Sequence, residues 1–272
     1  MTPLLCDSHN HLQDAALTPY REAIAAELNR IGVAKMVVNG TQERDWAEVL
    51  ALARRDAKVV PSFGLHPWFV RERSADWRKN LLKCLEERPA GIGEIGLDRW
   101  IEGYDLPEQE EVFVWQLRLA AERNLPVSIH CLKAWGRLLE LLQQEARPQC
   151  GFLLHSYGGP AEMIEPLARL GGYFSISGYF AQERKARQRA VFGQVPRERL
   201  LIETDAPDML PPQKFIEFPL PENSRKAVNN PANIGAVYRF VAELLEEPLE
   251  LVTRRTEENF NRLFGSIKQG TG

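Results

Sequence analysis

The stretch DSHNHL occupies residues 7–12, directly after the short apolar run from Leu4 to Cys6. In a doubly wound open sheet, the first strand is usually followed by a glycine-rich loop that binds phosphate. This stretch has no glycine and carries two histidines separated by one residue instead. It therefore favours the other common parallel α/β architecture, the (β/α)8 barrel, whose functional side chains stand at the carboxyl ends of the strands.

Short runs of apolar or β-branched residues recur along the chain and are predicted to be strands. They are Leu4 to Cys6, Lys35 to Asn39, Val59 to Gly64, Gly91 to Ile95, Val127 to His130, Phe152 to His155, Tyr173 to Ser177 and Leu200 to Glu203. The segments between most of them place apolar residues three and four positions apart, which is typical of amphipathic helices. Examples are Pro107 to Asn124, Trp135 to Glu145 and Ala161 to Leu170. This alternation predicts a parallel sheet with crossover helices.

Eight such units, without a linker rich in Pro, Gly or Ser, favour closure into a single TIM barrel over residues 1–272. The length agrees, because a barrel of this kind uses roughly 250 residues. The proline-rich stretch from Asp208 to Pro221 follows the eighth strand, and we expect it to form an active-site loop. The stretch from Asn233 to Lys268 is expected to supply the last helices.

The composition is that of a globular protein with a real core, with 44% hydrophobic and 26% charged residues. The net charge of −3 offers no broad positive field for long duplex nucleic acid. The four cysteines follow no CxxC spacing, and the first residues lack the pattern of a signal peptide, so we expect a cytoplasmic protein. No apolar run approaches the ~20 residues that cross a bilayer, and no obligate protein partner is indicated.

All histidines of the chain fall at or just beyond the carboxyl ends of predicted strands. They are His9, His11, His66, His130 and His155. Two acidic residues occupy equivalent places, Glu94 in GEIGLD and Asp205 in IETDAP. An isolated HxH is as often a core or surface pair as a metal site. The joint placement of all these residues at the face where barrels carry their active sites predicts a metal centre.

The strand positions suggest how two divalent ions are shared. Residues two apart on an extended segment point the same way, so His9 and His11 can reach one ion, and Asp205 joins them because strand eight lies beside strand one. Glu94 can bridge both ions through its two oxygens. The second ion is completed by His130 and His155. Imidazole with carboxylate suits Zn, Mn, Fe or Ni, and Mg with more water.

Two residues near these ligands are candidates for substrate binding. His66 either orients a ligand or substrate or has a structural role in the turn before Pro67. Lys133 follows His130 directly, so its place at the strand end makes it the best single candidate for a phosphate contact. Glu203 could point inward, in a buried supporting role or in a salt bridge.

Other side chains after strand ends offer weaker candidates. A basic run after strand seven could bind phosphate, although a solvated helix face is the more common role of such a run: Arg184, Lys185 and Arg187. Three aromatic residues could stack nucleobases or pack a loop: Trp68, Trp100 and Tyr157.

The ordered motifs DSHNHL, GLHPW, EIGLD, SIHCLKA, LLHSYGG, FSISG and ETDAP resemble those of the TatD family of metal-dependent deoxyribonucleases, within the amidohydrolase-like barrels. The resemblance extends from Asp7 to Asn261. It implies a (β/α)8 fold, a binuclear centre on the six ligands named above, and hydrolysis of phosphodiester bonds of DNA, often from an end. The chain departs from the family pattern at Arg99 and Trp100 and at Leu132 and Lys133, where substrate contacts are expected to differ.

The expected function is therefore a metal-dependent deoxyribonuclease acting on DNA or another phosphodiester. Two ions can activate a water and neutralise charge on the phosphoryl group, with Asp205 as the base and Glu94 as the bridge. The alternative is an amidohydrolase-type enzyme acting on an amide, lactone or ring amine; the resemblance implies that many binuclear members of that group use a modified lysine where this chain has Glu94. A noncatalytic metal-binding protein is a second alternative, which a turnover assay would separate.

Overall fold

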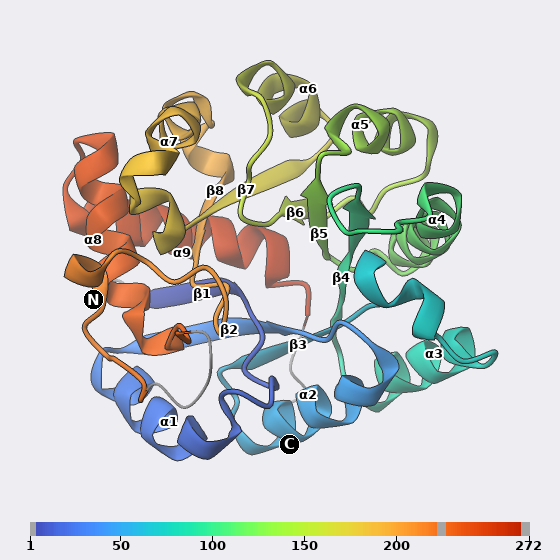
Figure 1. The fold of residues 1–272 in the computed structure, drawn as a ribbon, viewed down its shortest axis with the longest axis horizontal. Helices are drawn as coiled ribbons and strands as arrows, with labels where there is room; N and C mark the ends of the chain where they lie inside the picture. Colours follow the sequence, from blue (N-terminus) through green and yellow to red (C-terminus); the bar gives the residue numbers. More distant parts are fainter. Residues whose placement is uncertain (1–3, 222–226, 268–272) are drawn as a thin grey trace.

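The computed structural model describes residues 4–221 and 227–267, and its centre is a ring of parallel strands (Figure 1). The strands are β1 (Leu5–Asn10), β2 (Val33–Asn39), β3 (Val59–Phe63), β4 (Gly91–Asp98), β5 (Val127–Leu132), β6 (Phe152–Leu154), β7 (Gly172–Ser177) and β8 (Leu200–Glu203). Each strand pairs in parallel with the next, in chain order. The ring closes where Asp205 N–H donates to the carbonyl of His9 at 3.0 Å and His11 N–H donates to that of Ala206 at 2.7 Å. The predicted (β/α)8 barrel is confirmed.

The helices lie outside this ring, most of them around it (Figure 1). They are α1 (Arg21–Arg30), α2 (Glu43–Arg55), α3 (Trp77–Glu87), α4 (Leu106–Arg123), α5 (Trp135–Gln144), α6 (Ile164–Arg169), α7 (Ala186–Val191), α8 (Ile234–Leu245) and α9 (Leu249–Phe264). The helix predicted from Ala161 to Leu170 is divided into a 3-10 turn and the short α6. Pro166 has no N–H to donate to the carbonyl of residue 162, so the regular α-helical pattern begins later.

β1 is longer than predicted, since it continues through the polar residues up to Asn10 instead of ending at Cys6. These polar side chains are buried and have hydrogen-bond partners within β1, in β8 and directly after β8. Asp7 accepts hydrogen bonds from the backbone N–H and the hydroxyl of Thr204, at 3.0 and 2.6 Å. A strand prediction from apolar runs misses such residues, because their burial depends on partners almost two hundred positions away.

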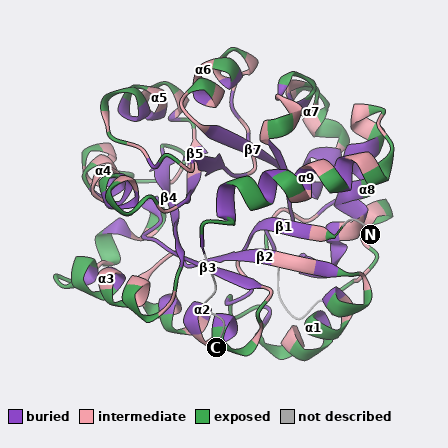
Figure 2. Cartoon of the chain, turned by 180° about the vertical axis from the view of Figure 1, so that it is seen from behind, coloured by how far each residue is buried: buried purple, intermediate pink, exposed green. Residues whose placement is uncertain are grey.

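α9 covers the amino-terminal end of the barrel (Figure 2). Its apolar side chains form a buried cluster with residues from several strands: Cys6, Val37, Val60, Leu153, Tyr173, Leu201, Phe260, Leu263, Phe264 and Ile267. The expected tail helices are α8 and α9, and Lys268 lies outside the described residues. With this end closed, the carboxyl end of the barrel is left for a site.

The stretch from Asp208 to Pro221 follows β8 and contains a single 3-10 turn, Gln213–Phe215. The carbonyl of Leu210 accepts a hydrogen bond from Gln182 Nε2 at 3.1 Å, so this stretch lies against the segment that follows β7. It is therefore at the face of the barrel where it was expected. None of the helices formed by the described residues is both long and apolar enough to cross a membrane.

Candidate metal centre

Glu94 lies at the centre of the candidate site, with histidines on both sides of its carboxylate. It comes from β4 and is only 2% exposed. Its Oε2 lies 3.2 Å from Nε2 of His11 and 3.4 Å from Nε2 of His9. Its Oε1 lies 2.7 Å from Nε2 of His155 and 3.2 Å from Nδ1 of His130. The two oxygens of one carboxylate thus face two different pairs of imidazoles.

Asp205 lies beside the pair of histidines from β1. Its Oδ1 is 3.6 Å from Nε2 of both His9 and His11. The residue has a φ of 51°, in the left-handed region that aspartate tolerates better than most residues, and its backbone N–H is bonded to β1. Potential ligand atoms of these three residues lie within 4.8 Å of one another, which is close enough for one ion.

Gly96 allows β4 and β5 to approach each other at the site. A Cβ atom at this position would lie 1.9 Å from the carbonyl oxygen of His130, and its φ of 156° is one that side chains rarely adopt. Only glycine permits this contact. The close approach brings Glu94 and His130 together on neighbouring strands.

Hydrogen bonds behind the imidazoles determine which ring nitrogen faces the site. Nδ1 of His11 lies 2.8 Å from the carbonyl of Asn39, to which it donates, so the neutral imidazole presents the lone pair of Nε2 to Glu94. His130 has the reverse orientation: its Nε2 lies 2.9 Å from Oδ2 of Asp98, and its Nδ1 faces Glu94. Metal-binding histidines usually have a partner of this kind on the second nitrogen.

Glu203 lies behind His155 and is fully buried. Its Oε1 is 3.7 Å from Nδ1 of His155 and accepts hydrogen bonds from the backbone N–H and the hydroxyl of Ser156, at 2.7 and 2.6 Å. Ser175 also donates its hydroxyl to this carboxylate. The inward direction of Glu203, left open by the sequence, is therefore established. Its potential ligand atom also lies within 4.8 Å of those of His9 and His155.

His66 also lies in this cluster, 4% exposed, with Nε2 at 3.3 Å from Oε1 of Glu94. The backbone N–H of Trp68 donates to its Nδ1 at 3.2 Å. A neutral imidazole that accepts on Nδ1 carries its proton on Nε2. His66 therefore presents an N–H donor to the centre, which distinguishes it from the histidines that can present a lone pair.

The buried carboxylates change the pKa values of the histidines that face them. Burial lowers the pKa of His11, but hydrogen bonds to Asp205 and Glu94 outweigh this and hold it well above the ordinary value. The same competition between burial and the charge of Glu94 raises the pKa of His155. Burial dominates for His66, whose pKa is lowered to about 4. Burial would raise the pKa of Glu94, but its interactions with the surrounding histidines, that with His155 above all, hold it well below its ordinary value.

This chemistry fits divalent metal ions. Within the part of the chain that the structure describes, Glu94 and Asp205 form ion pairs with histidines and with no lysine or arginine. Buried carboxylates are costly unless they are paired or bind a metal. Imidazole nitrogens with carboxylate oxygens are a common donor set for first-row divalent ions.

Asp98 and Asn39 support ligands and were missed by the sequence analysis. Asp98 is four residues after Glu94, and alternate residues of a strand share a face, so its position in GEIGLD was a signal that could have identified it. Its Oδ2 also accepts a hydrogen bond from Nε1 of Trp68 at 2.6 Å. Asn39 ends β2 and contacts both His9 and His11. Nothing in its sequence context indicates this role.

The predicted phosphate contacts lie nearer to solvent. Lys133 is exposed directly after β5, with a φ of 57°. In the basic run, Arg184 and Lys185 lie over the ring of Tyr179, at 5.2 and 4.9 Å from its centroid. Arg187 is exposed on α7. Of these residues, only Lys133 immediately follows a strand that carries a candidate ligand.

The three aromatic residues that were considered for base stacking differ in burial: Tyr157 is buried, whereas Trp68 and Trp100 are exposed. Tyr157 is 1% exposed, packs against Trp135 and Phe174, and donates its hydroxyl to the carbonyl of Pro160 at 2.7 Å. Of its two suggested roles, packing is the one observed, and stacking of a nucleobase is wrong because the ring is buried. Trp68 and Trp100 are 43% and 60% exposed.

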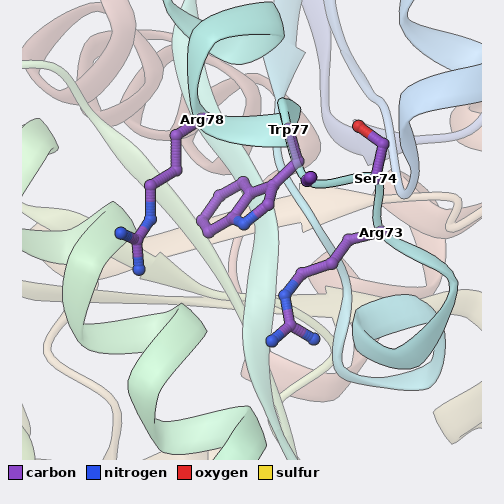
Figure 3. Close-up of a pocket in the computed structure, with 5 residues that line it drawn as sticks. Arg73, Ser74, Trp77 and Arg78 are labelled. Atoms are coloured by element: carbon purple, nitrogen blue, oxygen red, sulfur yellow. The ribbon is translucent and has the colours of Figure 1, made fainter.

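A cavity of about 350 Å³ lies at the start of α3, and none of the residues that line it is a candidate metal ligand (Figure 3). It is lined by Arg73, Ser74, Ala75, Trp77 and Arg78. Its two arginines are already paired, Arg73 with Glu108 at 2.5 Å and Arg78 with Glu111 at 3.1 Å. The cavity therefore offers no free cation for a substrate.

A closed parallel barrel that carries a buried cluster of histidines and carboxylates at the carboxyl ends of its strands is the architecture of metal-dependent hydrolases. Comparison with known proteins defines this class further. The chain belongs to the family of TatD-related DNases, whose model matches residues 6–265. The resemblance inferred from the motifs is confirmed, and the chain is a metal-dependent hydrolase of this family.

Two relatives from Escherichia coli K12 cover almost the whole chain. One, described as the uncharacterised metal-dependent hydrolase YjjV, is 30% identical over 95% of this chain and 96% of its own length. The other, described as the 3'-5' ssDNA/RNA exonuclease TatD, is 32% identical over 90% of this chain and 93% of its own. The crystal structure of YjjV superposes with a TM-score of 0.86 at 29% identity, covering 97% of this chain and 99% of that one.

A TatD-family hydrolase from Entamoeba histolytica has the same fold, with a TM-score of 0.85 at 21% identity, covering 97% of this chain and 99% of that chain.

Proposed function

We propose that this enzyme removes nucleotides from the ends of single-stranded DNA, using two divalent ions. His9, His11 and Asp205 would hold one ion, and His130 and His155 the other. Glu94 would bridge them. The observation that carries the proposal is the carboxylate of Glu94, whose Oε2 faces the first group of histidines while its Oε1 faces the second.

When bound, two divalent ions lower the pKa of a water and neutralise charge that develops on the phosphoryl group. Asp205 has a carboxylate oxygen next to the first group and no lysine or arginine paired with it among the described residues, so it is the candidate to take the proton of the attacking water. His66 would donate its Nε2 proton in a hydrogen bond to a phosphoryl oxygen, and Lys133 would contact a phosphate at the rim.

Single strands suit this molecule better than long duplexes. The net charge is −3, so the surface offers little compensation for the repulsion of a duplex. The relative TatD is described as an exonuclease of single-stranded DNA and RNA. Residues from the segments after β3, β4 and β8 contact the centre. We expect the free end of a single strand to reach such a centre more easily than a phosphate within a DNA double helix.

The test compares a linear single strand with a closed circle of the same sequence, at matched nucleotide concentration and with Mn or Mg. The linear strand should shorten stepwise, the circle should persist, and Asp205→Asn should be inactive on both. Cleavage of the circle at a similar rate would show that ends are not required. Turnover of an amide or lactone panel without cleavage of any nucleic acid would favour the amidohydrolase alternative.

A further inference from the structure

Exposed aromatic side chains gather on one side of the candidate site. Among the described residues, the large hydrophobic side chains that are exposed are Leu4, Trp68, Trp100, Tyr104 and Leu249. The three aromatic ones follow β3 and β4, as His66 also follows β3, and β4 carries Glu94 and ends at Asp98. Nothing in the proposed metal chemistry uses these aromatic surfaces.

Trp68 differs from the other two because both ends of the residue are fixed to the centre. Its backbone N–H donates to Nδ1 of His66 at 3.2 Å, and its indole Nε1–H donates to Oδ2 of Asp98 at 2.6 Å. The same oxygen of Asp98 lies 2.9 Å from Nε2 of His130. The indole of Trp68 therefore cannot turn without giving up its hydrogen bond to Asp98, the residue that contacts the candidate ligand His130.

The ring of Trp68 stands against the site with much of its surface open. Its centroid lies 5.1 Å from that of His66, with the planes at 90°, and 6.2 Å from that of His130. The side chain nevertheless remains 43% exposed. The polar edge of the indole is used by Asp98, so what it presents to solvent is flat and apolar. A residue needed only to hold Asp98 would not have to expose an indole at the mouth of the site.

Trp100 lacks this fixation. It is 60% exposed, and within the described part of the chain only its backbone N–H, which donates to Asp98 at 2.6 Å, has a polar partner. The ring centroid of Tyr104 lies 5.9 Å from the guanidinium of Arg99, and none of the described contacts ties Tyr104 to a candidate ligand. An indole that is already ordered loses little conformational freedom when a ligand stacks on it. Among these three aromatic side chains, Trp68 is thus the one that is preorganised to bind a flat group next to the candidate metal centre.

We propose that Trp68 is the stacking platform for the nucleobase of a nucleotide that flanks the cleaved phosphate. The proposal rests on the proposed nuclease function, and it names the nucleobase as the part of the substrate that the enzyme recognises. A base is one sugar away from its phosphate, so a phosphate at the Glu94 centre leaves its base near the rim formed by Trp68. A base within a duplex has both faces covered by its neighbours, whereas a base at a single-stranded end is free to stack.

The test uses matched single-stranded oligonucleotides that carry thymidine or 5,6-dihydrothymidine at one of the two nucleotides flanking the terminal phosphodiester. Dihydrothymidine keeps the hydrogen-bonding groups of the base but is neither aromatic nor flat. For the wild-type enzyme, kcat/KM should fall about 5- to 150-fold at one of these positions, the ratio that ~1–3 kcal/mol of stacking per base represents.

Substitutions of Trp68 and Trp100 show which residue causes the preference for thymidine. Trp68→Leu should lose the preference, mainly through a higher KM for the thymidine substrate, while Trp68→Phe should keep most of it because a flat ring remains. Trp100→Leu is the matched control and should behave as the wild type. Metal content, measured for every variant, reports whether the centre is intact.

Equal hydrolysis of both substrates by an active wild-type enzyme would overturn the platform and leave the nuclease function standing. A preference for thymidine that persists in Trp68→Leu but disappears in Trp100→Leu would also overturn the assignment to Trp68. If no oligonucleotide is cleaved under any metal condition, the proposed function itself fails, and the platform fails with it.

Discussion

At the scale of single residues, Glu94 connects the two halves of the candidate centre. One carboxylate can serve both groups because its oxygens point to opposite sides, toward β1 on one side and toward β5 and β6 on the other. Most of the remaining residues of the site act on one group only. The consequences of substitution should therefore differ in kind between Glu94 and its neighbours.

Glu94→Ala should lose at least the more weakly held ion, because the bridge supplies a ligand to both. Activity should fall by more than about 100-fold, the upper end of the loss seen when a residue only orients a ligand. Metal analysis of the purified variant measures this directly, with Lys133→Ala as a control that should keep its metal. Retention of both ions by Glu94→Ala would contradict the bridging assignment.

Asp98 is predicted to orient the imidazole of His130, and its substitution tests this role. Asp98→Ala should weaken metal binding about 10- to 100-fold, since the imidazole loses the partner that fixes its ring. Asp98→Asn keeps an oxygen acceptor and should lose less. Competition with a chelator gives the affinities. Unchanged affinity in Asp98→Ala would mean that packing alone orients His130.

Lys133 is predicted to bind substrate without acting on the ions. Lys133→Ala should raise KM for a phosphodiester more than it lowers kcat, as expected when binding common to the ground state and the transition state is removed. Lys185→Ala is the control, because that ammonium lies over the ring of Tyr179. Unaltered kinetics of Lys133→Ala on every phosphodiester would show that Lys133 is a solvated surface residue with no role in substrate binding.

At the scale of elements, α9 closes the end of the barrel opposite to the site. Phe260 is 2% exposed and packs among residues from the beginnings of the strands. This helix contributes no candidate ligand among the described residues. Stability and function are thus separated along the barrel axis, a division typical of this fold.

Phe260→Ala should therefore destabilise the protein by about 3–5 kcal/mol, the usual cost of removing a buried phenyl ring. Denaturant unfolding measures the change, and metal content at low temperature should remain that of the wild type. Leu249→Ala is a matched control on the same helix: Leu249 is 40% exposed, so its truncation should stay within about 0.5 kcal/mol. A loss of metal from folded Phe260→Ala would show that the two ends of the barrel are coupled.

At the scale of the whole molecule, the centre links metal binding to pH and to stability. The pKa values of His11 and His155 are held well above the ordinary value in the metal-free protein, because Glu94, Asp205 and Glu203 outweigh the effect of burial. A histidine whose pKa is higher in the folded than in the unfolded protein stabilises the fold. This stabilisation is fully present below the pKa of the unfolded chain, about 6.5, and it is lost as the pH rises through the pKa of the folded protein.

The metal-free protein should consequently have a lower Tm at about pH 8.5 than at about pH 6.5. The stabilisation by added Mn should increase over the same range, because a protonated imidazole cannot bind an ion and metal binding must release the proton. Thermal unfolding of chelator-treated and reloaded protein at both pH values provides the comparison. A Tm of the metal-free protein that rises with pH would show that the histidines are neutral without metal.

The architecture and the ligand types were predictable from the sequence, because both depend on residue identity and spacing. Alternating apolar runs predicted the barrel, and histidines at strand ends predicted a metal centre. Element ends were less predictable: β1 continues through buried polar residues, one of which, Asp7, finds its partner in Thr204, directly after β8.

The sequence by itself thus determined the parallel barrel and the family, and it predicted the types of side chain that gather at the candidate metal centre, since imidazole and carboxylate provide that chemistry. Tertiary structure alone decided how these side chains are used. The separate directions of the two Glu94 oxygens, the N–H that His66 presents, and the bond from Trp68 to Asp98 all depend on ring orientation and strand register. The burial of Tyr157 likewise follows from packing between distant segments, which no local pattern of residues records.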